Sequence, residues 1–61
     1  EVTQIGACYY EDHYESEAEA RQLAVTMINM YPSIVRFNVY RHWESRGYSG
    51  SHELPPVTRN T

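Results

Sequence analysis

The chain has 61 residues, of which 41% are hydrophobic and 21% charged, and its formal net charge is −3. This length allows one domain with a small core, because chains of this size bury only about 60% of their unfolded surface. A single cysteine excludes an internal disulfide, and the lack of a cysteine framework favours a reducing compartment.

The first predicted element is a β-strand over Val2–Tyr10, where polar and apolar residues alternate. We expect one parity of this strand to face the core: Ile5, Ala7 and Tyr9. The other parity, with Val2 and Cys8 inward, stays open. The next residues, 11–15, read as a short acidic connection to a helix.

A helix is predicted over Ser16–Tyr31. Ser16 followed by Glu19 is a capping box, in which the Ser hydroxyl accepts from the Glu19 N–H and the Glu19 carboxylate reaches back. Pro32 then stops the helix because it lacks an N–H and restricts the residue before it. The apolar residues recur at three- and four-residue spacing and form one stripe: Ala20, Leu23, Ala24, Met27, Ile28 and Tyr31.

A second strand is predicted over Ile34–Trp43, whose pattern has a period of two. Its core-facing residues are expected to be Val35, Phe37 and Val39. Its outward-facing residues are expected to be Arg36, Asn38, Tyr40 and His42. The Gly- and Ser-rich residues 44–53 indicate a turn region, and a short third strand near residues 52–54 is an open alternative.

These elements predict a single α+β domain over residues 1–54, followed by a tail at 55–61 that Pro55 and Pro56 separate from regular structure. A strand, a helix and a strand in this order form a right-handed parallel βαβ unit. We therefore expect one helix on a two- or three-stranded sheet with an unpaired edge. Such a small sheet predicts association, most simply as a dimer.

The charge is unevenly distributed along the chain. Residues 1–20 contain six acids and no Arg or Lys, whereas residues 21–61 contain five arginines and two acids. Helix-dipole stabilisation explains Glu17 and Glu19. It does not explain the whole acidic set, for which we predict a docking role on a basic groove. This acidic docking surface comprises Glu11, Asp12, Glu15, Glu17 and Glu19.

Arginine and aromatic residues concentrate in and after the second predicted strand, and both types are enriched at protein interfaces. We predict a protein-binding surface made of Arg36, Tyr40, Arg41, His42, Trp43, Arg46 and Tyr48. An alternative is nucleic-acid binding, with bases stacked on Tyr40 and Trp43 beside Arg36. Acidic net charge and the absence of Lys argue against it. A polar sheet face with no binding role is the third possibility.

No pattern of residues indicates a metal, a cofactor or catalysis. The three histidines, His13, His42 and His52, and Cys8 do not show the close paired spacing of zinc ligands. A Cys–His nucleophile pair needs a pocket, which a chain this small can hardly enclose. No apolar run has membrane-spanning or secretory length. We therefore expect a non-enzymatic, cytoplasmic protein without cofactor.

One resemblance follows from the order of elements across residues 5–43. A strand, a capped acidic helix (ESEAEARQLA), an aromatic-Pro exit (MYPS) and an Arg-bearing strand (VRFNVYR) resemble the layout of small phage-encoded proteins that inhibit bacterial enzymes. The inhibitors of host RNA polymerase are nearest in layout. The resemblance implies an inhibitor or regulator that docks on a host protein, and it assigns no functional residue. A nucleic-acid binder and an accessory structural subunit are the alternatives.

Overall fold

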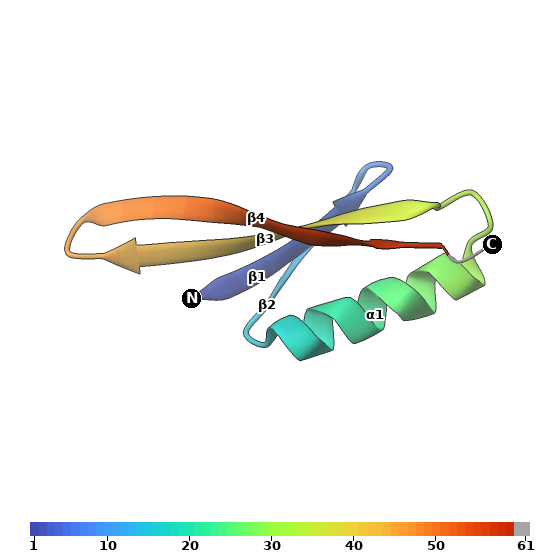
Figure 1. The fold of residues 1–61 in the computed structure, drawn as a ribbon, viewed down its shortest axis with the longest axis horizontal. Coiled ribbons are helices and arrows are strands. Elements are labelled where there is room, and N and C mark those ends of the chain that lie inside the picture. The colour runs from blue at the N-terminus through green and yellow to red at the C-terminus, as the bar shows by residue number, and fades with distance from the viewer. Residues whose placement is uncertain (60–61) are drawn as a thin grey trace.

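A computed structural model describes residues 1–59 of the chain and shows one helix packed on one face of a four-stranded sheet (Figure 1). The sheet order is β2-β1-β3-β4, and every neighbouring pair is antiparallel. The elements are β1 (Val2–Ala7), β2 (Tyr10–Tyr14), α1 (Glu17–Met30), β3 (Arg36–Ser45) and β4 (Tyr48–Thr58). The α+β class is confirmed.

The predicted parallel βαβ unit is wrong, and the cause is a tight turn at Cys8 and Tyr9. Both residues have positive φ, 46° and 70°, as a two-residue hairpin turn that follows strand twist requires. The turn pairs Ala7 with Tyr10 and makes β2 from most of the expected acidic connection. Because this added strand reverses the chain before α1, β3 returns antiparallel to β1. The sheet therefore has four strands rather than two or three.

A second hairpin replaces the expected turn region. Only Arg46 and Gly47 form the turn, with φ of 51° and 81°, and β4 follows directly. This strand continues through Pro55 and Pro56 to Thr58, so the sheet includes the first residues of the expected tail. Proline is tolerated there because β4 is an edge strand and its pairing with β3 shifts register beside the prolines. Residues 60–61 of the expected tail lie outside the described part.

The bounds of the helix agree with its sequence signals, but of the two bonds of the predicted capping box only one forms within residues 1–59, and none returns from the Ser16 N–H to the Glu19 carboxylate. Ser16 is the N-cap, and its Oγ accepts a hydrogen bond from the Glu19 N–H at 3.4 Å. The last helical residue is Met30 and the C-cap is Tyr31, directly before Pro32. Within the predicted stripe, three residues are buried, Leu23 and Met27 are half-buried, and Tyr31 is exposed. The buried residues are Ala20, Ala24 and Ile28.

The core lies between α1 and the sheet, with the fully buried side chains of Ile5, Phe37 and Val39 at its centre. Two expectations at strand ends are wrong. Val35 is 62% exposed and Ile34 is buried instead, because β3 begins only at Arg36. Tyr9, expected in the core, is fully exposed in the first turn. Tyr10 packs on the core instead, edge-on against Phe37 with 6.0 Å between the ring centroids.

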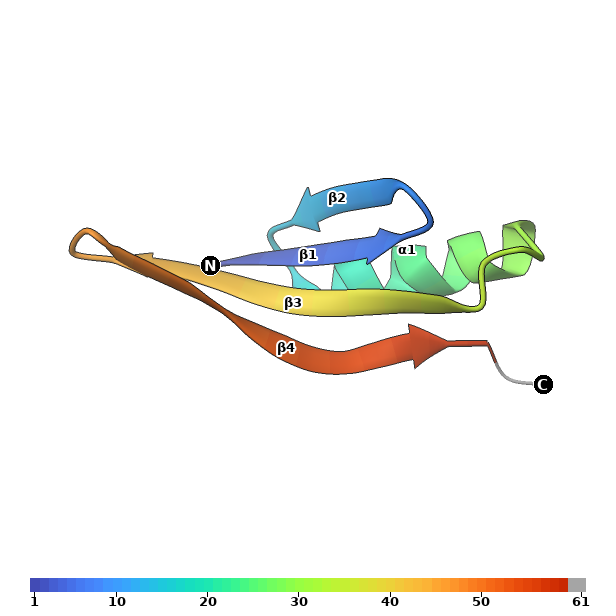
Figure 2. The same ribbon diagram turned by 90° about the horizontal axis from the view of Figure 1, so that it is seen from above.

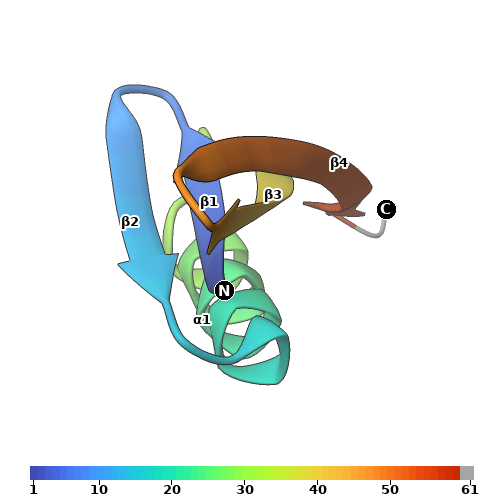
Figure 3. The ribbon, with the colours of Figure 1, turned by 90° about the vertical axis from the view of Figure 1, so that its left-hand side faces the viewer.

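The molecule is elongated, measuring 42 × 18 × 17 Å. The pairing of β1 with β3 reaches only as far as Val2, the first residue of β1, which lies opposite His42. Residues 43–50 therefore continue as a two-stranded ribbon that projects past the helix (Figures 1 and 2). We call this ribbon the hairpin arm. Seen from the arm end, the helix lies on one side of the curved sheet, and the other side is uncovered (Figure 3). Within residues 1–59, no helix is both long and apolar enough to span a membrane.

Candidate functional site

The candidate site is the sheet face opposite α1, which we call the open face. A row of directly opposed residues crosses all four strands on this face. His13 of β2 pairs with Gln4 of β1, Gln4 pairs with Tyr40 of β3, and Tyr40 pairs with Glu53 of β4. Side chains of opposed residues stand on the same face about 5 Å apart. The row therefore places a half-buried tyrosine at the centre of polar side chains.

Several of the surrounding polar side chains are already held in place. His42 Nε2 hydrogen-bonds the Gln4 Oε1 atom, and its ring lies 5.8 Å from that of His13. At the other end of the face, Arg36 Nε donates to Asn38 Oδ1 at 3.0 Å. These contacts join residues from three strands around Tyr40.

At the N-terminal end of β1, beside the hairpin arm, the surface has an open hollow of about 570 Å³. The step between the shorter β1 and the longer β3 produces this hollow. Its open-face lining is formed by Val2, His42, Glu44, Ser49 and Ser51. The hollow lies next to Tyr40, because His42 is two residues further along β3 on the same face.

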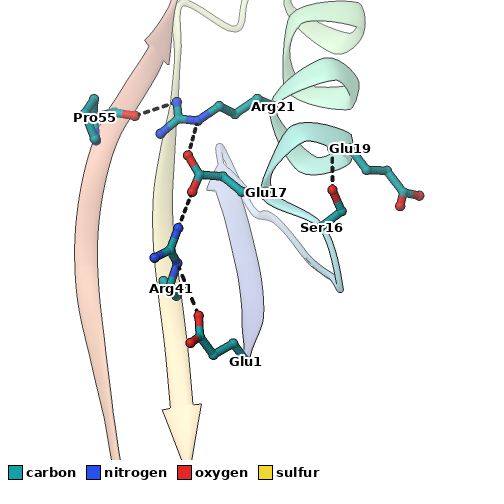
Figure 4. Close-up of polar contacts among 7 residues, drawn as sticks. All are labelled: Glu1, Ser16, Glu17, Glu19, Arg21, Arg41 and Pro55. Atoms are coloured by element: carbon teal, nitrogen blue, oxygen red, sulfur yellow. Dashed lines mark hydrogen bonds and ion pairs between the residues drawn. The ribbon is translucent and has the colours of Figure 1, made fainter.

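Three of the five arginines are used inside the fold. Arg21 Nε donates to Glu17 at 2.8 Å, and Arg41 binds the other oxygen of the same carboxylate (Figure 4). Arg21 also donates to the Pro55 carbonyl at 2.8 Å, and Arg41 reaches Glu1 at 3.5 Å. These contacts clamp the start of α1 to β3 and β4.

The third internal arginine, Arg59, stabilises the C-terminal end of α1. It donates to the carbonyl oxygen of Ile28, one of the last helical carbonyls that a helix leaves unsatisfied. It also donates to the carbonyl oxygens of the C-cap Tyr31 and of Ile34 in the connection to β3. Of the two remaining arginines, Arg36 bonds only Asn38 on its own strand, and Arg46 has no side-chain bond within residues 1–59. They lie at opposite ends of β3, on the order of 30 Å apart. The described surface therefore has no basic stripe.

The seven residues of the predicted protein-binding surface do not form one patch. Arg36, Tyr40 and His42 lie on the open face, as the alternation predicts. The alternate positions of β3, Arg41 and Trp43, lie on the helix side, and Tyr48 shares that side because it pairs with Ser45. Arg46 lies in the turn. Because side chains alternate between the two faces of a strand, residues that are neighbours in the sequence lie on opposite sides of the sheet. The prediction grouped them by their proximity in the sequence and missed this separation.

The five residues of the predicted acidic docking surface are also divided. Glu17 is neutralised by two arginines, and hydrogen bonds from Arg21 and then Arg41 hold its pKa below its ordinary value. Glu11 lies on the open face, 3.9 Å from His13. Glu15 and Glu19 are exposed around the start of the helix.

The remaining acid, Asp12, belongs to a cluster on β2. It accepts hydrogen bonds from the Tyr10 and Tyr14 hydroxyls, at 3.2 and 3.0 Å, and from the His13 backbone N–H at 2.8 Å. These bonds lower the pKa of Asp12, the His13 N–H most. The Tyr10 hydroxyl, followed by burial, raises the pKa of Tyr14 far above its ordinary value. This acid thus organises the edge of the sheet.

The hairpin arm contains a feature that the sequence patterns missed. The indole of Trp43 stacks on the ring of His52, with centroids 6.4 Å apart and planes at 24°, and it lies over Gly50. Its Nε1–H is buried without an acceptor among the described residues. The sequence signal for this contact was Gly50, which leaves room for an indole on the paired strand, followed two residues later by His52 on the same face.

The side chains that could bind a metal ion do not cluster within residues 1–59. Among residues 1–59, no group of three or more His, Cys, Asp or Glu side chains is arranged to hold a metal ion. Cys8 is a free, exposed thiol in the first turn.

Comparison of the chain with family models, curated proteins and solved structures finds no match in any of the three. The likeness to phage-encoded inhibitors thus stays a prediction, and the hairpin at Cys8 and Tyr9 adds a strand to the layout on which it rests.

Proposed function

We propose that the chain is a non-enzymatic protein-binding module, an inhibitor or regulator that docks through the open face of its sheet. One observation carries the proposal: α1 covers a single face of the sheet, and the uncovered face has Tyr40 at its centre. Tyrosine is enriched in interface hot spots because a large, rigid side chain becomes buried with its hydroxyl still able to bond.

The polar side chains around Tyr40 support the same proposal. The bonds from His42 to Gln4 and from Arg36 to Asn38 hold these groups before any partner arrives. Prior ordering lowers the entropy cost of binding. The adjacent hollow gives the face a concave end, which a protruding side chain of a partner would fill.

The distribution of charge favours a protein over a nucleic acid. Binding to phosphates needs several cations on one face, whereas three arginines are engaged internally and the other two lie far apart. The open face carries Glu11 and Glu53 as well as Arg36. Such a mixed surface suits a protein partner with both signs of charge. The resemblance to phage-encoded inhibitors would make that partner a bacterial host enzyme.

The test compares binding by three immobilised forms of the chain in a bacterial lysate: wild type, Tyr40→Ala and Gln22→Ala. Gln22 is exposed on α1, away from the open face, so its variant is the control. We expect one protein to be retained by wild type and Gln22→Ala and lost with Tyr40→Ala. With that protein purified, Tyr40→Ala should weaken binding at least about tenfold, as hot-spot truncations do. Equal retention by all three forms would contradict the proposal, and so would a steep salt dependence of binding to nucleic acid.

A further inference from the structure

The outer edge of β4 offers a second interaction surface, distinct from the open face. β4 is the last strand of the sheet, so one row of its backbone groups has no strand beside it. At one end this edge begins after the turn at Gly47. At the other it is blocked at Pro55, which lacks an N–H and whose carbonyl accepts from Arg21 at 2.8 Å. The free edge is therefore Tyr48–Leu54.

The two-residue turn determines which backbone groups of this edge are available. In such a turn the Tyr48 N–H points back to the Ser45 carbonyl, so alternate residues of β4 bond to β3. The residues between them direct both N–H and C=O away from the sheet. These outward-directed residues are Ser49, Ser51 and Glu53.

The free edge is complementary to itself. It contains seven residues, and its midpoint is Ser51. A two-fold axis at Ser51 places Ser51 opposite its own copy, Ser49 opposite Glu53, and Tyr48 opposite Leu54. All seven residues then find a partner, and no two acids face each other, which would be unfavourable. Moving the axis by one residue along the strand brings either Pro55 or the turn residue Gly47 into the pairing.

We propose that a second copy of this chain binds here, so that two β4 strands pair antiparallel about Ser51 and form one continuous eight-stranded sheet. Closed two-fold contacts of this kind use the same patch on both copies. Pairing would cover Tyr48, whose side chain is 74% exposed, with the second copy's half-buried Leu54. The edge that makes a small sheet prone to uncontrolled association would thus be closed by a defined partner.

Trp43 supports this register. Its indole lies over Gly50 with the Nε1–H buried and lacking an acceptor among residues 1–59. A buried donor without an acceptor is unfavourable. In the proposed register the residue opposite Gly50 is the second copy's His52. Its imidazole would lie beside the indole. Because Nε1 is buried in the monomer, the Trp43 ring would have to turn slightly for a nitrogen of this imidazole to accept the hydrogen bond.

The dimer would leave the open face and α1 free, because pairing extends the sheet within its own plane. The inference therefore does not depend on the proposed docking of Tyr40. A strand supplied by another protein could also occupy this edge, and the measurements below separate the two occupants.

The first measurement is the mass in solution, by light scattering and sedimentation, from micromolar to millimolar concentration. We expect wild type to dimerise with a concentration-dependent midpoint. Ser51→Pro removes an outward-directed N–H that the monomer does not use, as Pro55 already does on this edge. It should weaken the dimer at least about tenfold, whereas Ser51→Ala keeps the N–H and should dimerise like wild type. Far-UV circular dichroism at low concentration checks that both variants fold.

The second measurement tests the register by cross-linking in a Cys8→Ser background. Ser51→Cys should form a disulfide-linked dimer, because residues opposed in a hydrogen-bonded pair have Cα atoms about 5.5 Å apart, within the range for disulfides. Ser49→Cys is the control, since its two copies would lie about 14 Å apart and should not link. Ser49→Cys mixed with Glu53→Cys should link.

Three outcomes would overturn the inference. One is a wild-type chain that stays monomeric at all concentrations, which would leave the edge to another protein or to none. Another is equal dimerisation of Ser51→Pro and Ser51→Ala. The third is cross-linking of Ser49→Cys as fast as Ser51→Cys, because it would place the axis elsewhere.

Discussion

Glu17 in the first turn of α1 accepts a charge-assisted hydrogen bond from Arg41 of β3, a residue 24 positions later in the chain. The same carboxylate accepts from Arg21, one helical turn away, so two guanidinium groups share one acid (Figure 4). This contact joins the acidic first part of the chain to its arginine-rich second part. The charge asymmetry of the sequence is therefore partly an internal device that fixes α1 on the sheet.

The stability contributed by Glu17 should depend on pH. Because the two arginines, Arg21 first, hold its pKa below its ordinary value, its contribution is complete above the unfolded-state pKa of about 4.3. It is lost as the pH falls through the lower folded-state value. We expect Glu17→Gln to lower the melting temperature at neutral pH. In acid the wild type should lose stability until the two converge.

Glu19→Gln is the matched control, since it removes a charge from the same helical turn but from an exposed side chain that no ion pair in residues 1–59 engages. Its melting temperature should fall less at neutral pH. A difference between wild type and Glu17→Gln that stays constant on acidification would contradict the role of the ionised carboxylate.

Arg59→Ala should destabilise the domain although the residue follows the last strand. Its guanidinium donates to the carbonyl oxygens of Ile28 and Tyr31 at the end of α1 and of Ile34 just before β3, and hydrogen bonds from a charged group contribute about 1.5–3 kcal/mol. Chemical denaturation should show a loss of this order. Arg36→Ala, which breaks a single solvent-exposed bond to Asn38, should cost much less, and equal losses would contradict the capping role.

Phe37→Ala should unfold the domain or destabilise it by about 3–5 kcal/mol, because the ring is fully buried. Tyr40→Ala, on the open face, should leave the unfolding free energy nearly unchanged. Val35→Ala is a further control, since its side chain is 62% exposed. Thermal and urea denaturation measure all three, and a large loss in Tyr40→Ala would contradict the assignment of the faces.

Gly50→Ala should disturb the hairpin arm specifically. A Cβ at this position would lie 2.7 Å from Trp43 Cζ2, so the indole must move and its stacking on His52 should weaken. We expect a changed tryptophan fluorescence and near-ultraviolet circular dichroism, with a cost of about 1–3 kcal/mol. Ser49→Ala, on the opposite side of the ribbon, should change neither signal. An unaltered tryptophan signal in Gly50→Ala would show that the ring does not rest on Gly50.

Local patterns were sufficient for the bounds of the helix and for the two faces of β3 from Arg36 onward, but not for the start of that strand. Ser16, Glu19 and Pro32 act within one or two turns of their own positions, so the cap and the end of α1 follow from neighbouring residues. Likewise, the alternation around Phe37 and Val39 correctly predicts which side chains face the core, because the side-chain period of a strand is fixed by its backbone.

The sequence by itself thus determined the capped helix, the α+β class and the two faces of β3. Tertiary structure decided the rest. The turn at Cys8 and Tyr9 lacks the Asn or Gly that signals such hairpins, so the reversal of the chain and the antiparallel sheet stayed hidden. Contacts between distant residues also decided the fate of the charges, because Glu17 meets Arg41, and Arg59 meets the end of α1, only after the sheet has formed. The open face around Tyr40 exists for the same reason: its row of side chains comes from four strands that only folding brings together.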